Sequence, residues 1–284
     1  MALKTISPYI YLGYSCNNNC IFCSEADEYL ENLKIKSLDQ VKQEILTVRR
    51  QYDFINFMGR EPALREDFMD ILKFAKQQNF KQVGFTTNGR MLAYPEFAQR
   101  VLQVGVNQIG ISLAGADGQI HDQQTQVSGS FNQTIIGIKN VIKLKKPETS
   151  LLVNLPLNKL NYFVLKPALD LLFGMGVKEI NILFIAPLSR RSRNKKITMK
   201  MSQLGKYVFR TIKPYFNYAD LKILLVEFLP CSLPKEAQRY FFPCLEKNPD
   251  KIRIPLCLNC SYKTQCDGVL KSYIDLYGDG EFIL

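Results

Sequence analysis

The 284-residue chain has no tryptophan, a single histidine and no long apolar run. A membrane-spanning helix needs roughly 18 consecutive apolar residues, and no segment comes near that length. The N-terminal Met-Ala-Leu-Lys-Thr also lacks the apolar core of a signal peptide. We therefore expect a cytoplasmic protein without a membrane partner. The one histidine, His121, is the only possible histidine ligand for a zinc site built from three cysteines and one histidine.

Eight cysteines are present, and they cluster at spacings typical of metal ligands. A long chain without a secretory signal does not suggest a disulfide framework, so we expect reduced thiolates bound to metal. The apolar fraction of 46% is enough for one large core with a small appended module. The formal charge of +11 leaves an acidic partner open, although bound clusters would reduce the net charge.

Cys16, Cys20 and Cys23 form the most informative segment, Cys-Asn-Asn-Asn-Cys-Ile-Phe-Cys. Thiolates are soft ligands that suit iron-sulfur clusters or zinc, and these spacings let one loop wrap the corner of a cubane. A cubane held by three cysteines keeps one iron open for a small chelating molecule. The alternatives are a zinc knuckle and a buried reduced triplet.

This segment, with Phe22 before its third cysteine, resembles the CxxxCxxC signature of the radical S-adenosylmethionine (radical SAM) enzymes. Further segments resemble that family in the expected order along the chain. They are Gly59-Arg60-Glu61-Pro62, Thr86-Thr87-Asn88-Gly89, Ile111-Ser112-Leu113, and the stretch from His121-Asp122 through Gly129-Ser130-Phe131 to Ile135-Ile136-Gly137-Ile138.

Short apolar runs alternate with helical periodicity, which is the pattern of a parallel sheet with crossover helices. Ser37 and Gln40 form a predicted capping box for the first crossover helix. Six runs are predicted strands: 9–14, 54–58, 82–86, 108–113, 151–155 and 179–185. Six repeats do not close a full barrel, and they fit the family's open partial barrel. The expected fold is α/β, an open partial (β/α)6 TIM-like barrel over 1–220 with a C-terminal Cys-rich auxiliary-cluster module over 221–284.

The resemblance also implies the cofactor site, which would lie at the carboxyl ends of the strands. Cys16, Cys20 and Cys23 would hold a catalytic [4Fe-4S] cluster, and S-adenosylmethionine (SAM) would chelate its open iron. Gly59 and Glu61 would receive the amino group of SAM. The residues expected around its ribose, carboxylate and adenine are Thr87, Asn88, Ser112, Phe22, Ile185 and Ala186.

Arg60 departs from the family pattern, because a second glycine is usual at this position. Glycine permits backbone geometry or close approach that arginine restricts. The planar guanidinium would instead suit the cofactor carboxylate or an acidic group of the substrate.

The remaining cysteines lie in the last quarter of the chain. Cys257, Cys260 and Cys266 resemble the core of the SPASM and twitch modules, which carry auxiliary clusters. Leu270 stands where the full SPASM pattern has a further cysteine, so one auxiliary [4Fe-4S] cluster is expected. Cys231 is the preferred fourth ligand and Cys244 its rival. Structural zinc is the alternative to a cluster.

Two polar segments do not belong to these motifs. The basic run 190–196 is expected to be a solvated loop, with contact to an acidic peptide or a phosphate-bearing substrate as the second interpretation. His121 and Asp122 are expected at the start of a helix as a capping and packing pair. No RNA-binding domain pattern is present, so nucleic acid is not an expected partner.

By the resemblance, the protein reductively cleaves SAM to a 5′-deoxyadenosyl radical and abstracts hydrogen from a ribosomally made precursor peptide. The product would be a crosslink, an epimer or a rearranged backbone. An external one-electron reductant is implied. Because the first predicted strand begins near residue 9, a separate leader-peptide recognition protein, or direct leader binding by the barrel, is expected. The alternatives are a radical SAM enzyme acting on tRNA or a small molecule, and a non-catalytic iron-sulfur or zinc protein for electron transfer or binding.

Overall fold

The computed structural model describes residues 7–25, 35–218, 220–243 and 248–283. Its centre is a sheet of seven strands, each paired in parallel with the next along the chain. The strands are β1 (Tyr9–Tyr11), β2 (Phe54–Met58), β3 (Gln82–Thr87), β4 (Gln108–Ser112), β5 (Ser150–Leu157), β6 (Glu179–Phe184) and β7 (Lys222–Val226). Within the described ranges β1 and β7 each pair with one strand, so the barrel is open.

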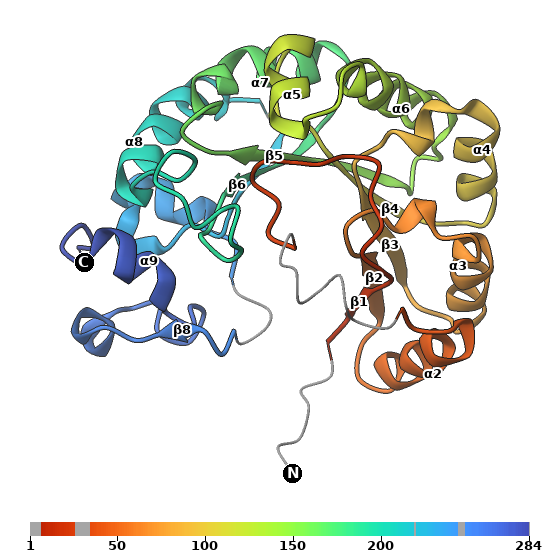
Figure 1. Cartoon of the computed structure of the whole chain (residues 1–284), viewed down its shortest axis with the longest axis horizontal. Coiled ribbons are helices and arrows are strands. Elements are labelled where there is room, and N and C mark those ends of the chain that lie inside the picture. Colours follow the sequence, from red (N-terminus) through yellow and green to blue (C-terminus); the bar gives the residue numbers. More distant parts are fainter. Residues whose placement is uncertain (1–6, 26–34, 219, 244–247, 284) are drawn as a thin grey trace.

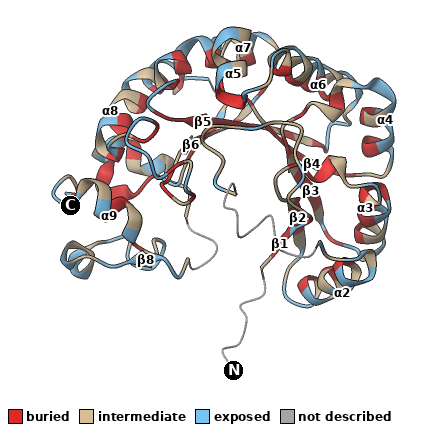
Figure 2. Cartoon of the chain, in the orientation of Figure 1, coloured by how far each residue is buried: buried red, intermediate tan, exposed pale blue. Residues whose placement is uncertain are grey.

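Helices cover the convex side of the curved sheet as an outer arc (Figure 1). They are α2 (Leu38–Arg49), α3 (Phe68–Gln77), α4 (Pro95–Gln103), α5 (Gly118–Thr125), α6 (Ser130–Leu144), α7 (Leu165–Gly174) and α8 (Met201–Ile212). Buried residues gather on the sheet and on the inner sides of these helices (Figure 2). In the parts of the chain that the structure describes, no helix has both the length and the apolar character needed to cross a bilayer.

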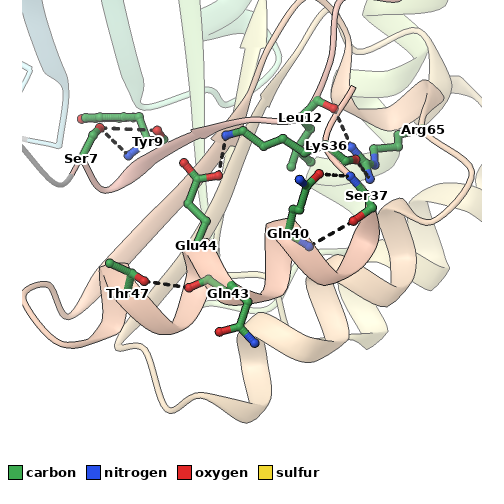
Figure 3. Close-up of polar contacts among 10 residues, drawn as sticks. All are labelled: Ser7, Tyr9, Leu12, Lys36, Ser37, Gln40, Gln43, Glu44, Thr47 and Arg65. Carbon is green, nitrogen blue, oxygen red and sulfur yellow. Dashed lines mark hydrogen bonds and ion pairs between the residues drawn. The ribbon is translucent and has the colours of Figure 1, made fainter. Parts of the chain in front are cut away.

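The first crossover helix begins as predicted. The Ser37 hydroxyl accepts from the Gln40 backbone N–H at 3.3 Å, and the Gln40 side chain accepts from the Ser37 N–H at 2.9 Å (Figure 3). Arg65 fastens this region to the sheet, since its guanidinium donates to the carbonyls of Leu12 and Lys36. The capping box is thus confirmed, and the entry to α2 is held against the end of β1.

The predicted fold class is confirmed, with one difference in the sheet. Each of the six predicted runs contains a strand, and β2 has the predicted bounds. β7 adds a seventh strand to the sheet and pairs in parallel with β6. This strand falls within 221–284, the range expected to form the C-terminal module. Strand propensity alone does not show which strand becomes its neighbour in the sheet.

The C-terminal segment, which here means the described residues 227–243 and 248–283, packs beside the β7 edge of the sheet (Figure 1). It contains the antiparallel pair β8 (Lys251–Ile252) and β9 (Val269–Leu270), followed by α9 (Lys271–Tyr277). Tyr273 is buried against the barrel, where its ring contacts Phe184 and its hydroxyl accepts from the Met201 N–H at 2.7 Å. These contacts hold the cysteine-rich segment in place on the barrel.

Candidate functional site

The cysteine loop follows β1 and leaves Cys16, Cys20 and Cys23 half-buried. Burial raises the pKa of Cys20 to about 12, and the nearby thiols of Cys23 and Cys16 raise it further. Burial likewise raises the pKa of Cys16. The thiols of Cys16 and Cys20 therefore stay protonated unless a positively charged centre binds them, and together with Cys23 they form a donor set that fits a metal cluster.

The backbone of the cysteine loop is anchored to the end of α5. Asn19 donates its N–H to the Thr125 carbonyl at 2.9 Å, and Ile21 donates to the Gln124 carbonyl at 3.0 Å. Loops that hold metal ligands gain precision from such fixed partners. The fourth crossover of the barrel therefore positions the first metal-binding segment, although more than a hundred residues separate them in the chain.

The loop after β2 packs directly under the cysteine loop. Gly59 has a φ of +131°, and a Cβ atom there would lie 2.6 Å from the Gly13 carbonyl oxygen, so only glycine fits. Arg60 is not among the described residues with positive φ, so its backbone tolerates a side chain. Its guanidinium donates to the Tyr14 carbonyl at 3.1 Å. The structure thus places Arg60 against the chain that enters the cysteine loop.

Glu61 is buried, with only 3% of its surface exposed, and joins the loops after β2 and β3. One carboxylate oxygen accepts from the Thr87 hydroxyl at 2.7 Å and the Ala63 N–H at 3.1 Å, and the other accepts from the Asn88 N–H at 2.7 Å. Burial raises the pKa of Glu61, while these hydrogen bonds oppose the rise. A carboxylate has about four lone-pair sites, so capacity for another donor remains.

Asn88 and Arg90 connect the β3 loop to the cysteine loop. The Asn88 amide donates to the Asn17 side chain at 2.6 Å and lies 3.8 Å from the Cys16 sulfur. Arg90 donates to the Asn18 side chain at 2.8 Å and to the Asn17 carbonyl. Arg90 is not among the site residues predicted from the sequence. Its only signal was a cation directly after the Thr-Asn-Gly turn.

Most of the remaining residues predicted to bind the cofactor lie at the carboxyl ends of the strands. Ser112 ends β4, and Ile185 and Ala186 follow β6, at the same edge of the sheet as the cysteine loop. Phe22 is half-buried within that loop. Their contact with the nucleoside of SAM stays a prediction.

The basic run 190–196 is mostly exposed, as expected, except that Arg191 is half-buried and Ser192 is buried. The Arg191 guanidinium donates to the carbonyls of Asn19 and Cys20, each at 3.1 Å. Just before the run, the Ser189 hydroxyl donates to the Cys23 carbonyl at 2.6 Å. The loop after β6 therefore braces the cysteine loop from the opposite side of the barrel.

His121 and Asp122 have packing and capping roles, but they lie within α5 rather than at its start. The Asp117 side chain caps that helix instead. Asp122 accepts from the N–H groups of Gly129 and Phe131 at the beginning of α6. The expected position was wrong because the helix begins at Gly118, several residues earlier, and the carboxylate caps the following helix.

Acidification should destabilise the fold through His121. Burial lowers the pKa of His121 to about 4, whereas an unfolded histidine titrates near 6.5. Between these pH values the unfolded state binds a proton that the folded state does not. The contribution of neutral His121 to the free energy of unfolding is therefore complete above pH 6.5 and is lost as the pH falls toward 4. Between pH 7 and pH 5 we expect the free energy of unfolding of the wild type to fall by about 2 kcal/mol more than that of His121→Gln. Urea unfolding of both proteins at the two pH values measures it, and equal losses would contradict it.

A second cysteine site lies in the C-terminal segment. Cys231, Cys257, Cys260 and Cys266 line one cavity. Burial, and then the thiols of Cys266, Cys260 and Cys257, raise the pKa of Cys231 to about 12. Cys244 lies outside the described residues. Across the described ranges, no three cysteine, histidine or carboxylate side chains are arranged to hold a single metal ion.

The concave face of the sheet encloses a cavity of about 840 Å³. All seven strands contribute to its wall, and the C-terminal segment contributes Cys266 and Asp267. This volume lies within the range of ligand-binding pockets. Cys266 also lines the four-cysteine cavity, so the second cysteine site borders the barrel cavity.

The sequence of this chain is similar to those of known proteins. The family model described as "Radical SAM superfamily" matches residues 10–164. A probable GTP 3′,8-cyclase of Saccharolobus islandicus is 28% identical over 181 residues, which cover 63% of this chain and 56% of that protein. The chain thus spans a little over half the length of the first curated relatives that it matches.

Two solved structures show the same fold at low sequence identity. Native anSMEcpe with bound AdoMet and Kp18Cys peptide has a TM-score of 0.66 at 13% identity, covering 97% of this chain and 92% of that one. Streptococcus suis SuiB bound to precursor peptide SuiA has a TM-score of 0.60 at 18% identity, covering 76% and 48%. Below 25% identity, such likeness establishes the architecture.

Proposed function

The chain belongs to the radical SAM superfamily, and from that premise we propose that it modifies a ribosomally made precursor peptide. The observation that carries the proposal is the convergence of four C-terminal cysteines on one cavity that shares Cys266 with the barrel cavity. This is the arrangement expected of an auxiliary-cluster module beside a substrate chamber. Two neighbours with the same fold were solved with peptides bound, which supports the choice of substrate class.

Membership of the family implies a [4Fe-4S] cluster and SAM. When bound, they supply a 5′-deoxyadenosyl radical that abstracts hydrogen from the substrate. Cys16, Cys20 and Cys23 would hold the cluster. Glu61, with spare acceptor capacity beside Asn88, would receive the amino group of SAM.

Other side chains would fix and shield this site. Arg90, Ser189 and Arg191 hold the cysteine loop through its backbone carbonyls, so the ligands keep one geometry. Phe22, Ser112, Ile185 and Ala186 would enclose the nucleoside, because its radical would otherwise attack any nearby C–H bond. Gly59 lets the loop after β2 approach the backbone of Gly13, which leads into the cysteine loop.

Cys231, Cys257, Cys260 and Cys266 would hold one auxiliary [4Fe-4S] cluster in a SPASM- or twitch-like module. Structural zinc held by the same cysteines is the alternative to this cluster. The proposed division between barrel and module at residue 220 places β7, which pairs with β6 in the sheet, at the start of the module. An external reductant and a separate leader-recognition protein would complete the system.

The fourth auxiliary ligand can be identified by iron analysis. The wild type should bind about eight irons after anaerobic reconstitution, and Cys231→Ala should bind about four because its auxiliary cluster loses a ligand. Cys244→Ala is the matched control and should keep about eight. The reverse pattern would make Cys244 the ligand, and zinc retained in place of iron would make the module structural.

Substrate class is tested by 5′-deoxyadenosine release in the presence of candidate precursor peptides or GTP. We expect a precursor peptide to raise the rate by about tenfold or more, because a bound substrate turns unproductive cleavage into hydrogen abstraction. A mass change in the peptide should accompany the increase. Stimulation by GTP alone would instead favour the second candidate, a small-molecule enzyme, which the similarity to probable GTP 3′,8-cyclases supports.

A further inference from the structure

The charge of the barrel cavity is opposite in sign to that of the whole chain. The sequence carries a formal charge of +11. The charged residues that line the cavity are Glu179, Glu227, Asp250 and Asp267 on the acidic side, and Lys222 and Lys251 on the basic side. Among the described residues, the wall therefore has two more carboxylates than ammonium groups.

Both lysines of the wall already have carboxylate partners. Lys222 pairs with Glu179 at 3.6 Å, where β6 and β7 begin. Lys251 pairs with Asp267 at 3.0 Å and with Glu227 at 3.6 Å. The excess of negative charge therefore lies on the side of the C-terminal segment, where Asp250 adds another carboxylate.

The strands present neutral hydrogen-bonding groups to the same cavity. The lining side chains of this kind on the strands are Asn56, Gln82, Thr86, Gln108, Asn154 and Asn181. Several pair across strands, as in the bond from the Asn181 amide to Asn154 at 3.1 Å. Amides both donate and accept, and so match the alternating N–H and C=O groups of a polypeptide backbone.

The geometry points to a peptide substrate whose segment inside the barrel is neutral or cationic, held by amides along the strands and by carboxylates beside the C-terminal segment. This inference rests on the proposed function and adds the charge class of the substrate. A nucleoside triphosphate does not fit such a wall, because its phosphates would face excess carboxylates while both lysines are engaged.

The test uses reconstituted protein with SAM and three synthetic peptides of equal length, each with one tryptophan. One peptide carries several lysines, one several glutamines and one several glutamates. The protein has no tryptophan, so fluorescence anisotropy reports on the probe alone. We expect the lysine peptide to bind about tenfold more tightly than the glutamate peptide. The overall positive charge would by itself favour the opposite order.

Two pairs of substitutions test whether the carboxylates of the cavity wall cause this preference. Glu227→Gln with Asp250→Asn removes two cavity charges at exposed positions and should bring the two affinities to within about twofold of each other. The matched control, Glu96→Gln with Glu148→Gln, removes two exposed charges outside the cavity lining and should leave the tenfold difference unchanged.

The outcomes separate this inference from the function on which it rests. If the glutamate peptide binds as tightly as the lysine peptide or more tightly, the charge inference fails and the peptide function stands. If Glu227→Gln with Asp250→Asn leaves the preference for the lysine peptide unchanged, the carboxylates of the cavity wall do not cause that preference and the inference also fails. If no peptide binds while GTP stimulates 5′-deoxyadenosine release, both fail.

Discussion

Replacing Cys16, Cys20 and Cys23 together by alanine should abolish 5′-deoxyadenosine release, a fall of about a thousandfold or more. The three thiols are neighbours, and each replacement removes a donor that the protein cannot supply from elsewhere in the loop. Iron should fall from about eight to about four per chain, because the C-terminal cysteines remain.

The fold should survive this triple substitution. The cysteines are half-buried, and the loop is held by backbone bonds from Asn19 and Ile21 to α5 rather than by the thiols. Ser24→Ala, at an exposed position in the same loop, is the matched control and should retain full iron and activity. Activity retained by the triple variant would show that these cysteines do not hold the catalytic cluster. Loss of all iron together with unfolding would show that the loop depends on its metal.

Glu61 should be the most sensitive position outside the cysteines. Glu61→Leu leaves the Thr87 hydroxyl and the N–H groups of Ala63 and Asn88 without their acceptor in a buried site. An unsatisfied buried group costs about 1–3 kcal/mol, so we expect about 4 kcal/mol of lost stability in urea unfolding. Unchanged stability would contradict the role of Glu61 in joining the two loops.

The isosteric Glu61→Gln separates stability from cofactor binding. Its amide retains one acceptor oxygen and loses the charge, so the fold should lose only about 1–2 kcal/mol. SAM binding, measured by equilibrium dialysis, should weaken by about tenfold or more because the charge-assisted bond to the cofactor amine is lost. Unchanged affinity would leave Glu61 with a structural role alone.

Local patterns in the sequence predicted the parts of the fold that depend on neighbouring residues. The capping box of Ser37 and Gln40 formed as expected. The strand runs alternate with helices in the expected order. Such features depend on short-range spacing, which a single sequence contains.

The sequence did not reveal the contacts that brace the site. Arg90, Ser189 and Arg191 bind carbonyls of the cysteine loop across more than seventy residues of chain. Every residue has a backbone carbonyl, so an acceptor of this kind does not restrict the residue type at its position. No pattern near the cysteines therefore pointed to these three side chains. The place of the seventh strand beside β6 was not predicted for a related reason, since the neighbour of a strand is determined by the tertiary fold.

The two cysteine sites lie differently with respect to the barrel cavity, whose described lining includes Cys266 and no residue of the first site. The first follows β1 at the carboxyl edge of the sheet, and the second shares Cys266 with the barrel cavity. Tyr273 holds the C-terminal segment, with its cysteines, against the barrel.

The most direct test of the central claim is the release of 5′-deoxyadenosine from the reconstituted, dithionite-reduced wild-type protein given SAM. We predict measurable release under anaerobic conditions, even without substrate, and none from the triple cysteine variant. If the cluster-loaded wild type releases none with any reductant or candidate peptide, the chain is not a radical SAM catalyst. Its cysteines would then serve binding or electron transfer.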